Sequence, residues 1–144
     1  MKLPLAFIFG SSMLLAACQS GPSLGANGSA ELANIRHVCI LARPAAKDPN
    51  PELKGEIAAA LNKYGISSEA VDTDAGRQRL YESDCRYNLR YNTNGRGNSI
   101  NYISLLIRTP EHSVASLRAY PNFTAGGNRQ AEIDRIIGQL LNKK

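Results

Sequence analysis

Apolar residues recur along residues 35–71 in a pattern that predicts a strand, a helix and a second strand. Residues 35–41 are mainly apolar and β-branched, as expected of a buried central strand. The helix starts at Asn-Pro-Glu, with Asn50 as its N-cap, and its apolar side chains repeat at helical spacing until Gly65. The second strand, residues 66–71, follows at once. A strand, helix and strand joined by short connections predict a parallel pair of strands.

Residues 84–120 alternate between apolar and polar side chains with a period of two, which is typical of strands that bury one face. In the first of these strands the inward side chains are Cys85, Tyr87, Leu89 and Tyr91, and the outward ones are Arg86, Asn88, Arg90 and Asn92. A glycine-rich loop at 94–98 and a tight turn at 109–112 separate three strands. Residues 72–80 predict a short helix or turn, and a last amphipathic helix begins after Asn128.

These elements predict an α+β fold in the order β-α-β-(α)-β-β-β-α. Both long helices are apolar along one side only, and the later strands have one polar face. A single mixed sheet with two amphipathic helices packed on one face accounts for both observations. Residues 35–144, about 110 residues, have the length of one domain.

The start of the chain has the pattern of an export signal. Lys2 precedes an apolar run, Leu5 to Ala17, that is too short to cross a bilayer, which needs roughly 20 residues. The run ends in Leu15-Ala16-Ala17-Cys18, which resembles the lipobox of bacterial lipoproteins. The resemblance implies that residues 1–17 are removed, that the thiol of Cys18 is diacylated and that the new amino terminus is acylated. The alternative is a plain signal peptide with an incidental cysteine.

Lipid chains on Cys18 would hold the protein on a membrane, with its soluble domain outside the bilayer. No Asp follows Cys18, and by resemblance to enteric lipoproteins this favours the outer membrane over the inner. We expect the domain in the periplasm, with the cell surface as an alternative. Residues 18–34 are rich in Gly, Ser, Ala and Asn, so we expect a flexible tether there.

Cys39 and Cys85 remain once Cys18 carries lipid, and an even pair in an exported protein predicts a disulfide. Two buried thiols are the alternative. If the strands that contain the two cysteines are antiparallel neighbours, Cys39 lies opposite Cys85 on the inward face, with Tyr87 and Leu89. No Cys-x-x-Cys motif or zinc-like spacing is present, and we expect no metal or other cofactor.

The globular part resembles a small periplasmic domain shared by several bacterial envelope proteins. The segments that carry the resemblance are PELKGEIAAALNKYGISSEAVDT, CRYNLRYNTNG and NYISLLIRTPEHSVASLRAY. The families are the amino-terminal domain of the Tol-system β-propeller protein, the curli-secretion lipoprotein and the lipoprotein activators of penicillin-binding proteins. Cys85 replaces their small residue, so the chain is more similar to small proteobacterial lipoproteins carrying Cys-Arg-Tyr-x-Leu-x-Tyr. These families imply protein binding and assembly support, without catalysis.

Catalytic signals are weak. The sequence contains no nucleophile elbow, phosphate-binding loop or His-Glu-x-x-His motif. His37 lies within an apolar strand and is expected to pack in the core, and His112 is expected in a solvated turn. We therefore expect no enzymatic activity.

The distribution of positive charge suggests a binding face on the later strands. Removal of Lys2 leaves 16 of the 17 Lys and Arg residues against 12 Asp and Glu, a net charge of about +4. Alternation places Arg86, Arg90 and Arg118 on the outward face with Tyr120. Arginine binds carboxylates and phosphates in a bidentate manner, so acidic proteins, peptidoglycan carboxylates and anionic lipids are candidate partners. A solvated face without a partner is the alternative. Nucleic acid is not expected outside the cytoplasm.

These observations predict a membrane-anchored lipoprotein that serves as an interaction or assembly module of an envelope complex. The alternative is a lipoprotein that binds a small ligand or glycan, or inhibits a hydrolase.

Overall fold

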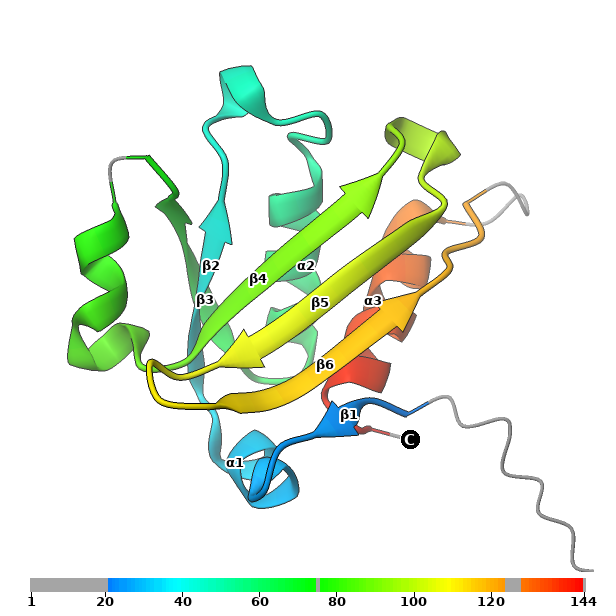
Figure 1. Ribbon diagram of the computed structural model, residues 1–144. Coiled ribbons are helices and arrows are strands. Elements are labelled where there is room, and N and C mark those ends of the chain that lie inside the picture. Colours follow the sequence, from blue (N-terminus) through cyan, green and yellow to red (C-terminus); the bar gives the residue numbers. More distant parts are fainter. Residues whose placement is uncertain (1–20, 75, 124–127, 144) are drawn as a thin grey trace, which may run out of the picture.

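The computed structural model describes residues 21–74, 76–123 and 128–143. They form one mixed six-stranded sheet and three α-helices (Figure 1), so the prediction of an α+β fold with a single mixed sheet is confirmed. The predicted signal, residues 1–17, and the predicted lipidation site, Cys18, lie outside the described residues. Within the described ranges, no helix combines the length and the apolar character needed to span a membrane.

The sheet has the strand order β1-β6-β5-β4-β2-β3. Its strands are β1 (Ser23–Leu24), β2 (His37–Ala42), β3 (Ser67–Asp72), β4 (Asn88–Asn94), β5 (Tyr102–Arg108) and β6 (Ser113–Ala119). Strand β2 is parallel to both of its neighbours, β3 and β4, whereas β4, β5, β6 and β1 pair with one another in antiparallel fashion. The parallel and antiparallel parts of the sheet therefore meet at β4.

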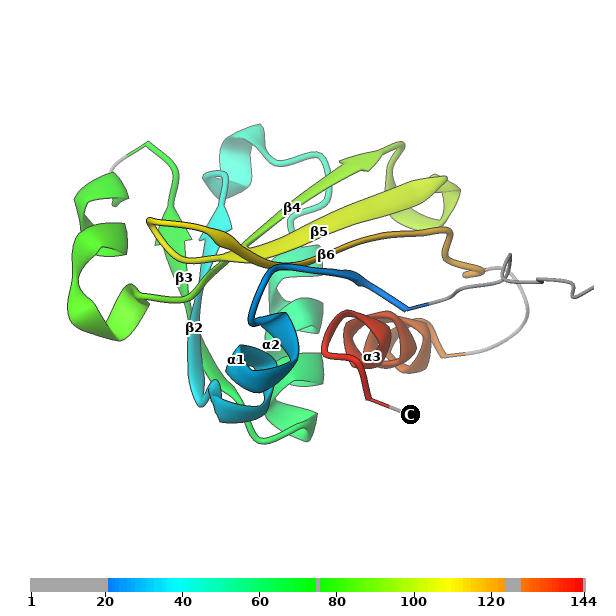
Figure 2. The same cartoon turned by 60° about the horizontal axis from the view of Figure 1, so that its bottom comes forward.

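Helices α1 (Gly28–Asn34), α2 (Leu53–Lys63) and α3 (Arg129–Leu140) lie on one side of the sheet (Figure 2). The main core fills the space between that side and the helices. Its largest fully buried side chains include Ile40, Ile57, Leu61, Leu89, Ile107, Ile133 and Ile137. The opposite side of the sheet, which we call the outer face, lies in front of α2 and α3 in Figure 1. Short 3₁₀ turns, η2 (Ala45–Lys47), η3 (Arg77–Tyr81), η4 (Ser83–Cys85) and η5 (Gly97–Ser99), complete the fold.

The predicted start of the first long helix is displaced. The helix begins at Leu53, and Asn50 does not cap it with its side chain. Asn50 is instead buried, and its amide donates to Thr93 Oγ1 at 3.0 Å and to the Gly95 carbonyl at 3.1 Å, and accepts from the Gly97 amide at 2.9 Å. The local sequence signal for a cap is therefore overridden by contacts that hold the β4–β5 hairpin.

The flexible tether predicted up to Asn34 is wrong for residues 21–34. These residues form β1, which pairs with the edge strand β6, and α1, which buries Leu32 in the main core. Glu31 of α1 also reaches His112 and Tyr87. Composition suggested disorder because the segment is poor in apolar residues. A few long-range contacts with Tyr87, with β6 and with the turn before β6 are enough to order it.

The disulfide between Cys39 and Cys85 is confirmed, but its predicted surroundings are wrong. Cys85 lies in η4, three residues before β4 begins, and Cys39 pairs with Asn88 of a parallel strand. After β3 the chain returns through η3 and η4 over the outer face, so β4 starts at the same end of the sheet as β2 (Figure 1). The disulfide therefore lies on the outer face, in a small cluster with Val71 and Leu80.

Candidate binding site on the outer face

The outer face has a covered part and an open part. The η3–η4 segment covers β2 and β3, where Leu80 and Cys85 pack on Cys39 and Val71. Strands β4, β5 and β6 are open, and their outward side chains form two rows across the sheet. The rows are Arg90, Leu106 and Ser116, and Asn92, Ser104 and Arg118. A shallow depression of about 490 Å³ runs over these rows.

The four residues predicted as a basic binding face lie in different settings. Arg90 and Arg118 are exposed on this open part of the sheet, and the Arg118 guanidinium lies 4.2 Å from the centre of the Tyr102 ring. Tyr120 directly follows β6 and is 66% exposed. Arg86 is not in a strand, because it ends η4, and its Nη1 lies 3.4 Å from Glu111 Oε1. Its charge is therefore partly compensated.

A polar pocket on this face lies where η3 meets the start of β4. It has a volume of about 340 Å³. We call it the arginine pocket; its lining residues are Arg77, Arg90, Arg108, Leu41, Leu80, Tyr81, Asn88 and Pro110. They come from β2, η3, β4, β5 and the turn before β6, so the pocket exists only in the folded chain.

The three arginines of the pocket have no carboxylate partner among the described residues. The ion pairs of arginine in those ranges involve Arg79, Arg86, Arg129 and Arg135 instead. Arg90 uses Nε to donate to Asn88 Oδ1 at 3.3 Å, and Arg108 uses Nε to donate to the Thr109 carbonyl at 3.0 Å. Within the described residues, their terminal nitrogens donate to no protein acceptor. The pocket thus gathers three positive charges, and the terminal nitrogens of Arg90 and Arg108 remain available to a ligand.

Arg79 fixes the wall of the pocket to the sheet. Its Nε and Nη2 donate to the carboxylate of Glu69 on β3 at 3.1 and 2.8 Å, and its Nη1 and Nη2 donate to Asp84 at 2.6 Å each. Nη1 also donates to Glu82. Hydrogen bonds from Arg79 hold the pKa of Glu69 and the pKa of Asp84 below their usual ranges, and these carboxylates raise the pKa of Arg79 in turn. Together with the disulfide at Cys85, this network anchors both ends of the η3–η4 segment.

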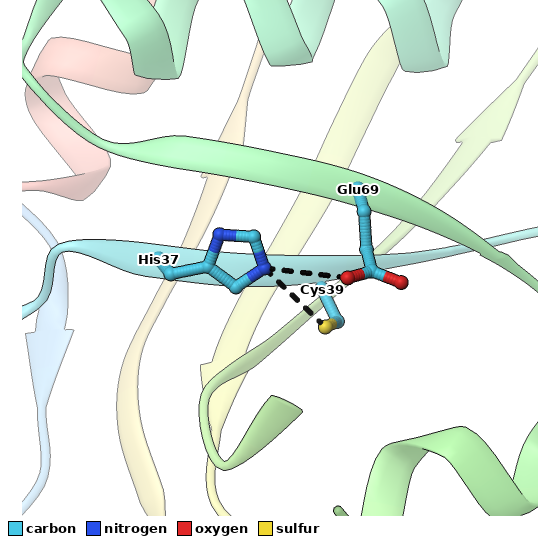
Figure 3. A group of neighbouring side chains, drawn as sticks. All are labelled: His37, Cys39 and Glu69. Atoms are coloured by element: carbon cyan, nitrogen blue, oxygen red, sulfur yellow. Dashed lines mark hydrogen bonds and ion pairs between the residues drawn. The ribbon is translucent and has the colours of Figure 1, made fainter. Parts of the chain in front are cut away.

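A second cluster, His37, Cys39 and Glu69, lies beside this network and has the residue types of a metal site (Figure 3). His37 Nε2 lies 3.5 Å from Glu69 Oε1 and 3.9 Å from Cys39 Sγ, and His37 Nδ1 lies 2.6 Å from Ser67 Oγ. Because Cys39 Sγ is bonded to Cys85, it has no thiolate to offer a metal. The cluster is therefore a set of structural contacts, and His37 lies on the outer face, half-buried, rather than in the core as expected.

His112 is exposed in the turn before β6, as expected, but it also contacts a carboxylate of α1. Its Nε2 lies 2.7 Å from Glu31 Oε1, and Tyr87 donates to the other oxygen of that carboxylate at 3.1 Å. Burial alone raises the pKa of Glu31, but the hydrogen bonds from His112 and Tyr87 outweigh it and hold that pKa below its usual range. Both histidines therefore take part in side-chain contacts that join separate elements.

Sequence reasoning named Arg90 but missed the pocket. The alternation that places Arg90 outward also places Arg108 outward, since Ile107 before it is buried, so this residue could have been found. Arg77 and Tyr81 could not, because they come to β4 only through the fold of the η3–η4 segment. Comparison of the chain with protein-family models, with curated proteins and with solved structures finds no match.

Proposed function

We propose that this protein is a lipid-anchored component of a bacterial cell envelope that binds an acidic partner through the outer face of its sheet, without catalysis. The observation that carries the proposal is the set of arginines on that face, Arg77, Arg90 and Arg108 with Arg118, none of which is in an ion pair with a described carboxylate. Uncompensated charge on one face attracts partners of the opposite charge and orients them.

The lipobox-like Leu15-Ala16-Ala17-Cys18 and the disulfide support an address outside the cytoplasm, because disulfides persist in oxidising compartments. We place the anchor in the outer membrane and the folded part in the periplasm. We also propose that the packing of α2 and α3 on one side of the sheet is that of the periplasmic binding domain which the sequence resembles. On this view the partner is an envelope protein, with peptidoglycan carboxylates and lipid phosphates as other anionic surfaces within reach.

A binding role accounts for the chemistry of the described residues better than catalysis does. His37 and His112 are held by Ser67, Glu69 and Glu31, and both Cys39 and Cys85 are oxidised. General acid or base catalysis needs a titrating group positioned beside a substrate site. The arginine pocket contains no His, Cys or carboxylate among its lining residues.

Affinity purification from cross-linked envelopes tests the partner. We compare the full-length chain with the double variant Arg90→Glu/Arg118→Glu and with the matched control Lys54→Glu/Lys143→Glu, which reverses two charges on the helix side. We expect the first double variant to lose the captured partner and the control to retain it. Equal capture by all three proteins would exclude the outer face as the interface.

Mass spectrometry of the native chain tests the anchor separately. We expect fatty acyl groups on Cys18 and a mature chain that begins there. A mature chain that retains residues before Cys18, or an unmodified thiol, would contradict the anchor while leaving the binding face untouched.

A further inference from the structure

We propose that the arginine pocket binds an oxyanion, phosphate or carboxylate, that is carried on a small apolar or aromatic group. This inference rests on the proposed use of the outer face for binding and deepens it by assigning a ligand class to one defined site.

The charge of the pocket favours an anion. Arg77, Arg90 and Arg108 line one volume of about 340 Å³, and no described carboxylate pairs with any of them. Like charges brought together repel one another, so a bound anion would stabilise the arrangement. The neighbouring Arg79 shows the contrast, because it meets three carboxylates, Glu69 on β3 and Glu82 and Asp84 on the η3–η4 segment. The chain thus pairs one arginine of η3 with carboxylates and leaves Arg77, whose charge acts on Asp74 only at longer range, without an ion pair.

The donors suit an oxyanion. A guanidinium presents a planar fork of N–H groups that matches the two oxygens of a carboxylate or phosphate. Arg90 donates through Nε to Asn88, and Arg108 donates through Nε to the Thr109 carbonyl. These hydrogen bonds fix each side chain and leave its terminal nitrogens available to a ligand. Asn88 itself is buried beneath the pocket, so the Arg90 side chain is held from below.

The remaining lining residues are apolar. Leu41, Leu80 and Pro110 form walls, and Tyr81, at the rim, is 79% exposed. An exposed aromatic ring beside an arginine cluster offers a surface on which a flat apolar group can stack. The volume lies at the lower end of the range of small-molecule sites, about 300–1,000 Å³, so it suits one small group rather than a polymer chain.

Isothermal titration of the full-length chain in a non-ionic detergent tests the proposal with four probes. Phenyl phosphate and 3-phenylpropionate carry the two oxyanions on a ring, inorganic phosphate lacks the ring, and benzyl alcohol lacks the charge. We expect at least one of the two ring-bearing anions to bind more tightly than inorganic phosphate and benzyl alcohol. Which of the two binds more tightly identifies the oxyanion that the site prefers.

Variants locate the binding. Arg90→Gln and Arg108→Gln should each weaken the preferred probe by about tenfold or more, as expected for loss of charge-assisted hydrogen bonds. Arg96→Gln removes the same charge from the hairpin loop at the other end of β4 and should leave the affinity unchanged. Tyr81→Ser, at an exposed position that folding tolerates, should reduce the advantage of the ring-bearing anion over inorganic phosphate.

Three results would overturn the inference: no binding by any anionic probe, binding of benzyl alcohol as tight as that of the anions, or equal affinity in Arg90→Gln, Arg108→Gln and Arg96→Gln. Any of these results can occur together with loss of the captured envelope partner in Arg90→Glu/Arg118→Glu. The outer face would then bind a protein, and the pocket would not be a ligand site. If the probes bind but Arg90→Glu/Arg118→Glu still captures the partner, the ligand site in the pocket is supported and the proposed protein interface is contradicted.

Discussion

Cys39 on β2 and Cys85 in η4 are joined by a disulfide on the face of the sheet opposite to α2 and α3, with their Cα atoms 5.2 Å apart. The bond ties the end of the η3–η4 segment to the sheet. Because Arg77, Leu80 and Tyr81 of that segment form one wall of the arginine pocket, the disulfide is a structural support of the candidate site as well as of the fold.

Removal of the disulfide should lower the free energy of unfolding by about 4 kcal/mol, the value of the chain-entropy model for a loop of this length. The two cysteines are 46 residues apart. Urea unfolding of Cys39→Ser/Cys85→Ser, against the oxidised wild type, measures this difference. Reduced wild type is the control and should match the variant. A loss below about 1 kcal/mol would mean that the contacts of Arg79 hold the segment without the covalent bond.

Arg79→Gln should reduce the pH dependence that Glu69 and Asp84 add to stability. Since the pKa values of both carboxylates are lowered in the folded chain, the unfolded chain binds more protons between the folded and the ordinary values. Their contribution is complete above the ordinary values of 4.5 and 3.8 and is lost as pH falls through the lowered folded values. Melting temperatures from pH 7 down to pH 2.5 should fall less steeply in the variant. Parallel curves would contradict this role of Arg79.

Glu31→Gln should loosen α1 from the end of the sheet. The substitution removes the charge that meets His112 and Tyr87, and we expect a loss of about 1 kcal/mol, allowing for the partial exposure of the histidine. Hydrogen exchange should become faster in residues 28–34 with little change in α3. Glu52→Gln, at an exposed position before α2, is the matched control and should have no effect. Unchanged exchange in α1 would show that Leu32 alone holds this helix.

Gly138→Ala should destabilise the protein, although alanine is the better helix former. A methyl group on Gly138 would meet the hydroxyl and ring of Tyr64, so this side chain must move and lose its hydrogen bond to the Asp134 carbonyl, at a cost of about 1–3 kcal/mol. Gly55→Ala is the matched control in α2, where a methyl group meets nothing, and should stabilise by about 0.5–1 kcal/mol. Chemical denaturation measures both.

Tyr64→Phe tests whether contact with the Tyr64 hydroxyl causes the destabilisation by Gly138→Ala. It removes the nearest atom that the new methyl group would meet, so Gly138→Ala should cost less in the Tyr64→Phe background than alone. Equal costs in the two backgrounds would place the effect of the alanine elsewhere.

The elements with clear periodicity could be predicted because they depend on neighbouring residues. The apolar stripe with Ile57 and Leu61 corresponds to α2, and the stripe with Ile133 and Ile137 corresponds to α3. Gly65 follows α2 with a φ of 81°, as expected of a left-handed helix end. In contrast, β1 has only two residues, and it exists because the edge of β6 offers backbone partners to Ser23 and Leu24. No local pattern could reveal it.

Some residues of the candidate site could likewise be predicted from the sequence, and others could not. Arg90 and Arg118 were predicted as outward because strand alternation alone sets the side of a residue. Asn88 follows the same alternation, yet it is buried, because the η3–η4 segment closes over that end of the outer face. Arg77 and Tyr81 join the site through that segment, which Arg79 and Cys85 hold in place.

The sequence by itself determined which stretches form the two long helices and the longer strands and which side of α2, α3, β5 and β6 is buried, and it predicted the disulfide once Cys18 was set aside. These properties follow from residue spacing and from a count of cysteines. Only the tertiary structure decided that β4 runs parallel to β2, that the disulfide lies on the outer face, and that three arginines surround one pocket. The physical reason is that these features depend on where the chain returns after β3, which is set by contacts between distant residues and not by any local period.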